Sequence, residues 1–254
     1  MKHIRYERVG DGAVLTLDHP ERMNAVSEPL LEGLSEGLDR AVAEGARAIL
    51  LTGAGRAFCA GGTIAEPLPE DAGAILETHL NPLLMKLAAL PVPLIAAVNG
   101  PAIGAGMSLA LSADLVVAAR SARFGAGFVQ VGLVPDGGLS WLLARSIGYH
   151  RAMAVLIQGA TLDAEQALAL GLATRVVADE VLADETRGLL LQLASGPTLS
   201  LAATRRLVRE ALDRDWTAAL AAERAAQGAA GRTSDFREGA SAFIGRRKPQ
   251  FTGA

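Results

Sequence analysis

Two glycine-rich turns in the sequence could together stabilise negative charge on an oxygen atom. One spans residues 53–63 and follows an apolar run, and the other spans residues 99–106 and precedes a segment rich in Leu and Ala. Glycines let the backbone approach a ligand closely and adopt positive φ where a turn needs it. A helix that begins after such a turn points unpaired N–H groups and the positive end of its dipole forward. We therefore expect a phosphate, or an oxygen that gains charge during a reaction, to bind here.

Three interpretations compete for the second turn. A dinucleotide-binding fingerprint needs a third glycine, where the chain has Leu109. A nucleophile elbow would use Ser108, but an elbow serine directly follows its strand, and ten residues separate Ser108 from Val98. An oxyanion hole would use a backbone N–H of this turn together with a second donor. The turn at residues 53–63 is the candidate for that second donor.

The strands and helices that must position these turns follow from the apolar pattern. The predicted strands are residues 4–9 and 13–18, joined as a hairpin, and residues 48–52, 93–98, 114–119 and 174–177. Apolar residues at helical spacing predict a helix that follows Ser27 as its N-cap, and further helices at residues 79–90, 107–113, 139–147 and 150–158. Asp163 and Gln166 form a capping-box pattern for one more helix, which ends near residue 171.

The pattern divides the chain into two regions. Strands and helices alternate over residues 1–195, whereas residues 196–254 contain only amphipathic helical patterns. We expect a mixed α/β core followed by a helical C-terminal region. Phe236, Phe243 and Ile244 give that region apolar faces that one chain has little left to cover, so we expect association between copies of the chain.

Composition excludes several classes of function. The chain has 254 residues, of which 50% are hydrophobic, and a formal net charge of −3, which argues against binding to nucleic acid or to a membrane surface. Cys59 is the only cysteine, the first residues do not resemble a signal peptide, and the longest apolar run contains two prolines. The four histidines show no metal-ligand spacing. We expect a cytoplasmic protein that binds no metal.

Taken together, the two turns resemble the paired oxyanion-hole signatures of the crotonase (enoyl-CoA hydratase/isomerase) superfamily. The motifs are Phe58-Cys59-Ala60-Gly61-Gly62 and Asn99-Gly100-Pro101-Ala102-Ile103-Gly104-Ala105-Gly106, and the likeness extends from residues 20–25 to residues 237–243. The resemblance implies an α/β spiral of ββα turns with a helical C-terminal region that builds trimers or dimers of trimers. It also implies acyl-CoA thioester substrates, with coenzyme A as part of the substrate and no separate cofactor.

The resemblance also assigns roles to individual residues. The backbone N–H groups of Gly62 and Ala105 would form the oxyanion hole. The residues that would bind the substrate and its CoA group are Arg22, Met23, Ala25, Ala60, Gly61, Gly62, Thr63, Ile64, Gly104, Ala105, Phe128, Val131 and Pro135. Among these, Phe128 would line the pocket for the acyl group.

Two positions depart from the pattern of the hydratases in this superfamily. Hydratases place two glutamates across the substrate alkene, and the matching positions here hold Ser108 and Phe128. Neither side chain can act as a carboxylate base, so hydration is disfavoured. Thr63 also replaces an aspartate that is common after the first turn, although threonine can still cap a helix.

One carboxylate matches a position that carries chemistry in the superfamily. Asp136 corresponds to the active-site aspartate of some isomerases and dehalogenases. Val131, Val134, Pro135 and Phe128 would make its surroundings apolar, and we expect its pKa to be raised towards the range of a general base. The alternative is that Asp136 only caps the helix that follows Gly137 and Gly138.

The leading hypothesis is therefore an acyl-CoA isomerase that forms a thioester enolate, with Asp136 as the base. The pattern is most similar to isomerases of the superfamily that shift a Δ3 double bond to Δ2 or that act on a ring-1,2-epoxyphenylacetyl-CoA in phenylacetate breakdown. A hydratase-like lyase is the alternative within the superfamily. The alternatives from other classes are a thioesterase that uses Ser108 and an acyl-CoA-binding protein without catalytic activity.

Overall fold

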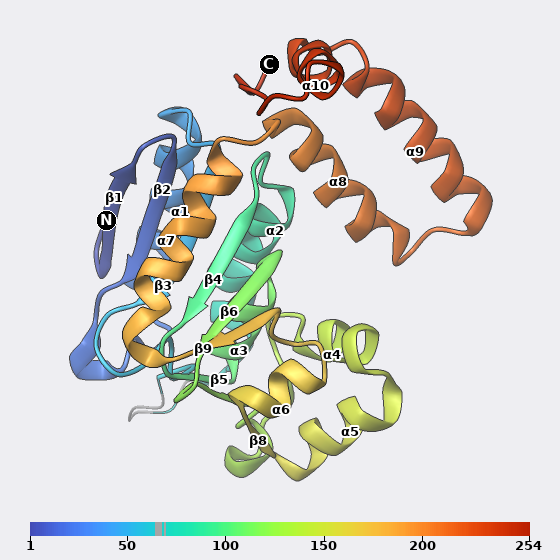
Figure 1. Cartoon of the computed structure of the whole chain (residues 1–254). Coiled ribbons are helices and arrows are strands. Elements are labelled where there is room, and N and C mark those ends of the chain that lie inside the picture. Colours follow the sequence, from blue (N-terminus) through green and yellow to red (C-terminus); the bar gives the residue numbers. More distant parts are fainter. Residues whose placement is uncertain (64–67, 69) are drawn as a thin grey trace.

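The computed structural model describes residues 1–63, 68 and 70–254, and a six-stranded sheet forms its centre (Figure 1). In sheet order the strands are β1 (Ile4–Val9), β2 (Gly12–Leu17), β3 (Ala48–Gly53), β4 (Leu94–Val98), β6 (Leu115–Ala119) and β9 (Arg175–Val177). β1 and β2 pair antiparallel, which confirms the predicted hairpin. The other neighbours pair parallel.

The three strands β3, β4 and β6 are buried on both faces, which explains their nearly continuous apolar sequence. On one face, Ile49 and Leu51 pack in a core with residues of α1 (Glu28–Ala43), α2 (Asn81–Ala89) and α3 (Ala105–Leu111). On the other face, Leu50 and Ile95 pack in a second core with α7 (Leu182–Ala194). Figure 1 shows α7 lying across the sheet on that side. The sheet is therefore a rigid middle layer between two helical layers.

A second, three-stranded sheet was not predicted from the sequence. It consists of β5 (Pro101–Ile103), β7 (Arg123–Gly125) and β8 (Thr161–Asp163), with β5 parallel to β7 and β7 antiparallel to β8. Strands of three residues are too short to show an alternating pattern. This sheet matters for the candidate site because β5 carries the chain from β4 to the start of α3.

The remaining elements surround the sheets. The helices are α4 (Leu139–Ile147), α5 (Tyr149–Gln158) and α6 (Ala164–Ala169), with shorter helical turns at Pro20–Arg22, Leu76–Leu80, Val129–Val131 and Asp179–Val181. The bounds of α4 and the capping box of Asp163 and Gln166 are as predicted. Ser27 occupies the N-cap position of α1, but its side chain makes no capping hydrogen bond. Within the described residues, no helix combines the length and the apolar character needed to cross a bilayer.

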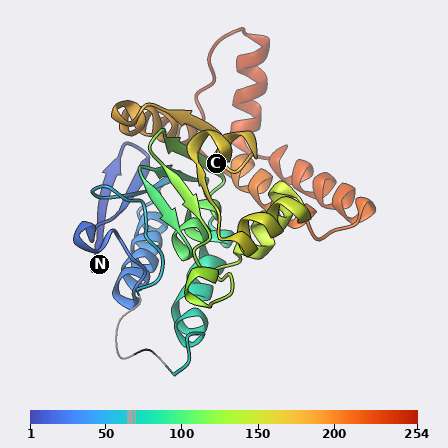
Figure 2. The ribbon, with the colours of Figure 1, turned by 90° about the horizontal axis from the view of Figure 1, so that it is seen from below.

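The C-terminal region contains α8 (Thr198–Ala211), α9 (Trp216–Ala230) and α10 (Ser234–Ile244). In both views these helices lie to one side of the central sheet (Figures 1 and 2). The predicted division at residue 195 falls between the end of α7 and the start of α8. That division stays a prediction.

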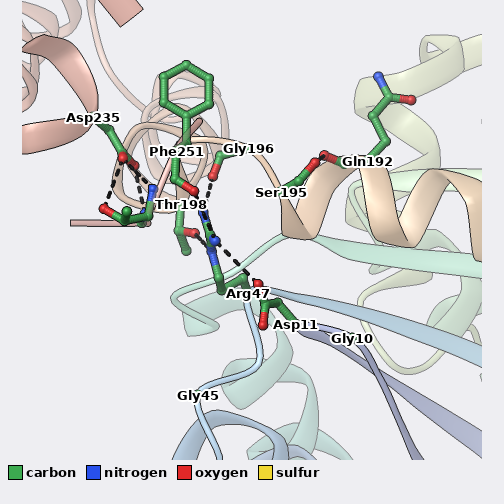
Figure 3. Close-up of polar contacts among 12 residues, drawn as sticks. Gly10, Asp11, Gly45, Arg47, Gln192, Ser195, Gly196, Thr198, Asp235 and Phe251 are labelled. Carbon is green, nitrogen blue, oxygen red and sulfur yellow. Dashed lines mark hydrogen bonds and ion pairs between the residues drawn. The ribbon is translucent and has the colours of Figure 1, made fainter. Parts of the chain in front are cut away.

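Arg47, directly before β3, connects the C-terminal region to the core (Figure 3). Its guanidinium donates to Thr198 Oγ1 at 2.9 Å, to the Gly196 carbonyl at 2.6 Å and to the Phe251 carbonyl at 3.3 Å. The buried carboxylate of Asp235 accepts from the N–H groups of Thr252 at 2.7 Å and Gly253 at 2.9 Å. Charge-assisted hydrogen bonds of this kind are stronger than neutral ones. They therefore hold residues 251–253 against Arg47 and α10.

Candidate active site

The two glycine-rich turns meet through a short stretch of backbone pairing. Cys59 and Ala102 form a parallel bridge, in which the Ile103 N–H donates to the Cys59 carbonyl at 2.9 Å. The Cys59 N–H in turn donates to the Pro101 carbonyl at 3.1 Å. This pairing places the turn that contains Gly62 beside the start of α3. Cys59 itself is completely buried, and burial raises the pKa of its thiol to about 11.

Glycine is required where the two turns touch. A Cβ at Gly106 would lie 2.2 Å from the Cys59 carbonyl oxygen, and a Cβ at Gly61 would lie 2.6 Å from the Ile103 carbonyl oxygen. Gly61 also has a φ of +87°, which side chains disfavour. Any side chain at either position would push the turns apart, and backbone atoms cannot move aside as a flexible side chain can.

The N–H groups of Gly62 and Ala105 are the predicted donors of the oxyanion hole. Val26 pairs with Gly62 through bonds to the neighbouring residues, because the Val26 N–H donates to Gly61 and the Thr63 N–H donates to Val26. Ala105 is the first residue of α3, where a backbone N–H has no acceptor within the helix. Among the described residues, neither N–H has a hydrogen-bond partner. Gly62 is exposed, and nothing lies within 4 Å of the position of its missing Cβ.

Two asparagines that the sequence analysis did not select hold the first turn. Asn24 is fully buried with a φ of +55°, and its amide nitrogen donates to the carbonyls of Ala54 at 2.9 Å and Ala57 at 2.8 Å. Its side-chain oxygen accepts from the His19 N–H. Asn99 likewise donates to the Gly55 carbonyl at 3.0 Å. Asparagine bonds loop carbonyls, which is the signal that could have identified both residues, and it tolerates the positive φ found at Asn24.

The residues expected to bind CoA come from two loops that are bonded to each other. The Ala60 N–H donates to the Met23 carbonyl at 3.0 Å, and the Thr63 hydroxyl donates to the Val26 carbonyl at 3.2 Å. Arg22 and Met23 are exposed, and Ala25 is half-buried. Ile64 was also predicted to bind substrate but lies outside the described residues. The structure thus brings the loop at residues 22–25 next to the first glycine-rich turn.

Asp136 is half-buried, and one oxygen of its carboxylate lacks a partner. This atom, Oδ1, is buried and accepts no hydrogen bond from the described residues. Burial raises the pKa of Asp136 from 3.8 to about 6, which confirms the predicted direction. The alternative role as a helix cap is wrong, because Gly138 is the N-cap of α4 and no side chain caps that end.

Of the apolar residues predicted around Asp136, Phe128 is the most buried. Its ring atoms lie 3.6–3.7 Å from the position that a Cβ on Gly104 would occupy, so it borders the oxyanion-hole turn. Pro135 is half-buried. Val131 and Val134 are 50% and 77% exposed, and their part in the surroundings of the carboxylate stays a prediction.

Ser108 does not have the environment of a nucleophile. It is the fourth residue of α3 rather than part of a tight strand-to-helix turn, and it is completely buried. Its hydroxyl hydrogen-bonds two carbonyls, those of Asp136 at 3.1 Å and Gly104 at 3.4 Å. A serine nucleophile needs a base as its hydrogen-bond partner, and a carbonyl oxygen cannot take up its proton.

One other cluster has the residue types of a metal site. Ligand atoms of Glu28, Glu32 and His79 lie within 4.8 Å of one another. His79 Nε2 is 3.3 Å from Glu28 Oε1 and 3.6 Å from Glu32 Oε1, and both glutamates are well exposed. Exposed acidic side chains are common without a bound ion, so we assign no metal to this cluster.

Comparisons with known proteins match this fold and site. Residues 10–254 match the family described as enoyl-CoA hydratase/isomerase. The "1,2-epoxyphenylacetyl-CoA isomerase" of Escherichia coli K12 is 44% identical over 94% of each chain, and a "probable enoyl-CoA hydratase" of Rhodobacter capsulatus is 42% identical over 98% of each chain. The crystal structure of enoyl-CoA hydratase subunit I from Geobacillus kaustophilus covers 99% of this chain and 98% of its own, with a TM-score of 0.94 at 35% identity.

These matches span nearly the whole chain, and the chain belongs to the enoyl-CoA hydratase/isomerase family, with the crotonase fold. The resemblance identified from the two glycine-rich turns is thereby confirmed, as is the predicted fold class of a mixed α/β spiral with a helical C-terminal region. Members of this family act on acyl-CoA substrates. The relatives carry both isomerase and hydratase names, so the reaction must be argued from this chain's own residues.

The raised pKa of Asp136 predicts how stability depends on pH. Between its ordinary pKa of 3.8 and about 6, the folded protein retains a proton that the unfolded chain has released. The free energy of unfolding should therefore fall as pH rises through this window. Asp136→Asn removes this contribution, so the variant should gain stability relative to wild type as pH rises from 4 to 6.5, measured by urea unfolding. A difference that is independent of pH would contradict the burial of the carboxylate.

Proposed function

We propose that this protein is an acyl-CoA isomerase that forms an enolate of the substrate thioester. The observation that supports this proposal best is the carboxylate of half-buried Asp136. Its Oδ1 atom has no hydrogen-bond partner among the described residues, and its main chain is bonded to α3, the helix that begins with Ala105. The positions where hydratases carry two glutamates hold Ser108 and Phe128 instead. One base and an oxyanion hole suffice to move a proton between two carbons, whereas activation of water needs further acid–base groups.

In the proposed mechanism, the N–H groups of Gly62 and Ala105 bind the thioester oxygen. Asp136 removes a proton from C2 of a 3-enoyl thioester, and the electron pair of that C–H bond moves to the thioester oxygen. The negative charge that develops there is stabilised by the two N–H groups. Asp136 then returns the proton to C4, so that the double bond moves from C3–C4 to C2–C3 with no atom gained or lost. A pKa near 6 leaves most Asp136 ionised at neutral pH yet basic enough to act.

The acyl group is proposed by chemical class. Phe128 offers an apolar or aromatic surface beside the oxyanion hole. A simple double-bond shift and the isomerisation of a ring epoxide in phenylacetate breakdown are the two candidate reactions. The loops at residues 22–25 and 60–63 are proposed to hold the CoA group. The proposal requires no cofactor apart from the CoA of the substrate, and the protein is proposed to act in the cytoplasm.

Asp136→Asn tests the proposed base directly. The substitution is nearly isosteric, and Oδ1 of Asp136 has no hydrogen bond to lose among the described residues. Loss of a general base typically lowers the rate by ~10²–10⁴-fold. We expect isomerisation of a 3-enoyl-CoA to fall by that amount while the affinity for acyl-CoA, measured by calorimetry, stays within threefold. Asp163→Asn, at the last residue of β8, is the control and should leave turnover unchanged, because asparagine can still cap α6. Normal turnover by Asp136→Asn would show that the base lies elsewhere.

Hydratase activity is the main alternative because several relatives carry hydratase names. With Ser108 and Phe128 in place of two glutamates, the protein lacks two acid–base groups for the hydration of crotonyl-CoA. Each such group typically raises the rate ~10²–10⁴-fold. We expect this hydration to be at least about 100-fold slower than isomerisation of a 3-enoyl-CoA by the same preparation. Comparable rates for the two reactions, followed by absorbance and chromatography, would favour the hydratase.

The alternatives from other classes predict different observations. A thioesterase that uses Ser108 would react with a fluorophosphonate probe and release free CoA. A protein that only binds acyl-CoA would show calorimetric binding without proton exchange at C2. The buried hydroxyl of Ser108, bonded to carbonyls, disfavours the first of these, and the unpaired carboxylate of Asp136 disfavours the second.

We also propose that the protein assembles as a homotrimer or a dimer of trimers. Phe236, Phe243 and Ile244 on α10 are 56%, 86% and 82% exposed, and an apolar groove of about 1020 Å³ separates α2 and α4 from α8 and α9. Apolar area of this kind is typical of surfaces that contact another copy.

Light scattering at micromolar concentration should give a molar mass three or six times the 26.2 kDa of one chain. Phe243→Asp places a charge on this apolar surface and should lower the measured molar mass. A monomeric wild-type protein would refute the proposal.

A further inference from the structure

The hydroxyl of Ser108 has one proton and two carbonyl oxygens within reach. These belong to Gly104, at 3.4 Å, and to Asp136, at 3.1 Å. The Gly104 carbonyl already accepts from the N–H groups of Met107 at 2.9 Å and Ser108 at 3.1 Å, which fill both of its lone pairs. The proton of the Ser108 hydroxyl therefore lies towards the main chain of Asp136.

The Asp136 carbonyl is in this way held from two sides. It also accepts from the Leu139 N–H at 3.0 Å, a bond that closes the turn leading into α4. The Ser108 hydroxyl ties the same oxygen to α3. The peptide group of Asp136 is thus fixed between two helices, although its carboxylate makes no such bond.

Packing at Gly137 supports the same conclusion. Gly137 has a φ of +57°, and a Cβ on it would lie 2.7 Å from the Ser108 Cβ and 3.4 Å from a methyl carbon of Leu84. The main chain after Asp136 therefore runs directly against Ser108, where only glycine fits. Ser108 is completely buried, so its hydroxyl has no access to water as another partner.

Ser108 also lies one helical turn after Ala105, whose N–H is the candidate oxyanion donor. Residues three positions apart lie on the same side of a helix. The support for the base and the donor to the oxyanion are therefore carried by one short, buried helix. Their relative position is then fixed by α3 rather than by the loop that carries Asp136.

We propose that Ser108 is a positioning residue, whose hydroxyl bond to the Asp136 main chain holds the catalytic base in register with the oxyanion hole. This inference rests on the proposed function in taking Asp136 as the base. Without the bond, the turn at residues 136–138 can move away from α3, and a shift of about 1 Å in a reacting group lowers the rate by up to ~10²-fold. CoA binding should change little, since residues 22–25 and 60–63 lie elsewhere.

The test compares three variants with wild type. Ser108→Ala removes the hydroxyl, and Ser108→Cys fills the same space with a group that donates only weakly. Ser112→Ala is the matched control, because Ser112 is the buried C-cap residue of α3, four positions after Ser108. Among the described residues, its hydroxyl donates only to the Ser108 carbonyl, at 2.8 Å. We expect kcat for isomerisation to fall ~10–100-fold in both Ser108 variants, with KM within threefold and no change in Ser112→Ala.

A pH measurement separates positioning from loss of stability. A turn that moves outward exposes the carboxylate, so the acid limb of kcat/KM should move from near 6 towards 4 in Ser108→Ala, but not in Ser112→Ala. The same shift should appear in a ¹³C NMR titration of the Asp136 carboxyl without substrate, with Asp136→Asn used for assignment. Unchanged kcat in Ser108→Ala, recovery of activity in Ser108→Cys, or an unshifted titration would overturn the proposal.

The titration without substrate also distinguishes a failure of the proposed reaction from a failure of the role proposed for Ser108. If wild type shows no isomerase activity but the Asp136 titration shifts in Ser108→Ala, the proposed reaction is wrong and the positioning by Ser108 stands. If wild type isomerises and Asp136→Asn is inactive, while Ser108→Ala behaves as wild type in both measurements, the function stands and the role of Ser108 is refuted.

Discussion

The candidate site depends on one backbone contact, the parallel bridge between Cys59 and Ala102. The contact brings two loops, which follow β3 and β4, so close that Gly61 and Gly106 have no space for a Cβ. Two backbone N–H groups can bind one oxygen atom only when the main chains that carry them lie close together. Side-chain donors would not need this proximity, and this difference explains why glycine occurs at both crossing points.

The carboxylate of Asp136 is placed by a different physical principle. Among the described residues it has no ion-pair partner, and burial raises its pKa to about 6. An unpaired buried charge destabilises a protein, and a buried group with a perturbed pKa is a candidate for a functional role. α3 and α4 hold the main chain of Asp136 through Ser108 and Leu139, while Oδ1 has no hydrogen-bond partner among the described residues. A fixed backbone with an unbonded carboxylate is the arrangement that a general base needs.

The sequence predicted those parts of the structure that depend on long-range patterns. The hairpin, the buried parallel strands, the bounds of α4 and the capping box all follow from repeated apolar spacing or from known turn chemistry. The three-residue strands β5, β7 and β8 were missed because they are too short to show a period. The exposure of Val134 and the bond from Ser108 to Asp136 could not be predicted, since both depend on how a loop packs against distant helices.

The central claim is that the two turns and Asp136 together generate a thioester enolate. The most direct measurement is the exchange of the C2 protons of phenylacetyl-CoA in deuterated water. This thioester has no alkene, so the exchange can be followed without a double-bond shift and without knowledge of the natural substrate. The account predicts that wild type incorporates deuterium at C2 far faster than buffer alone, with a rate that falls below pH 6 as Asp136 becomes protonated. Exchange no faster than in buffer, by protein that binds the thioester, would contradict it.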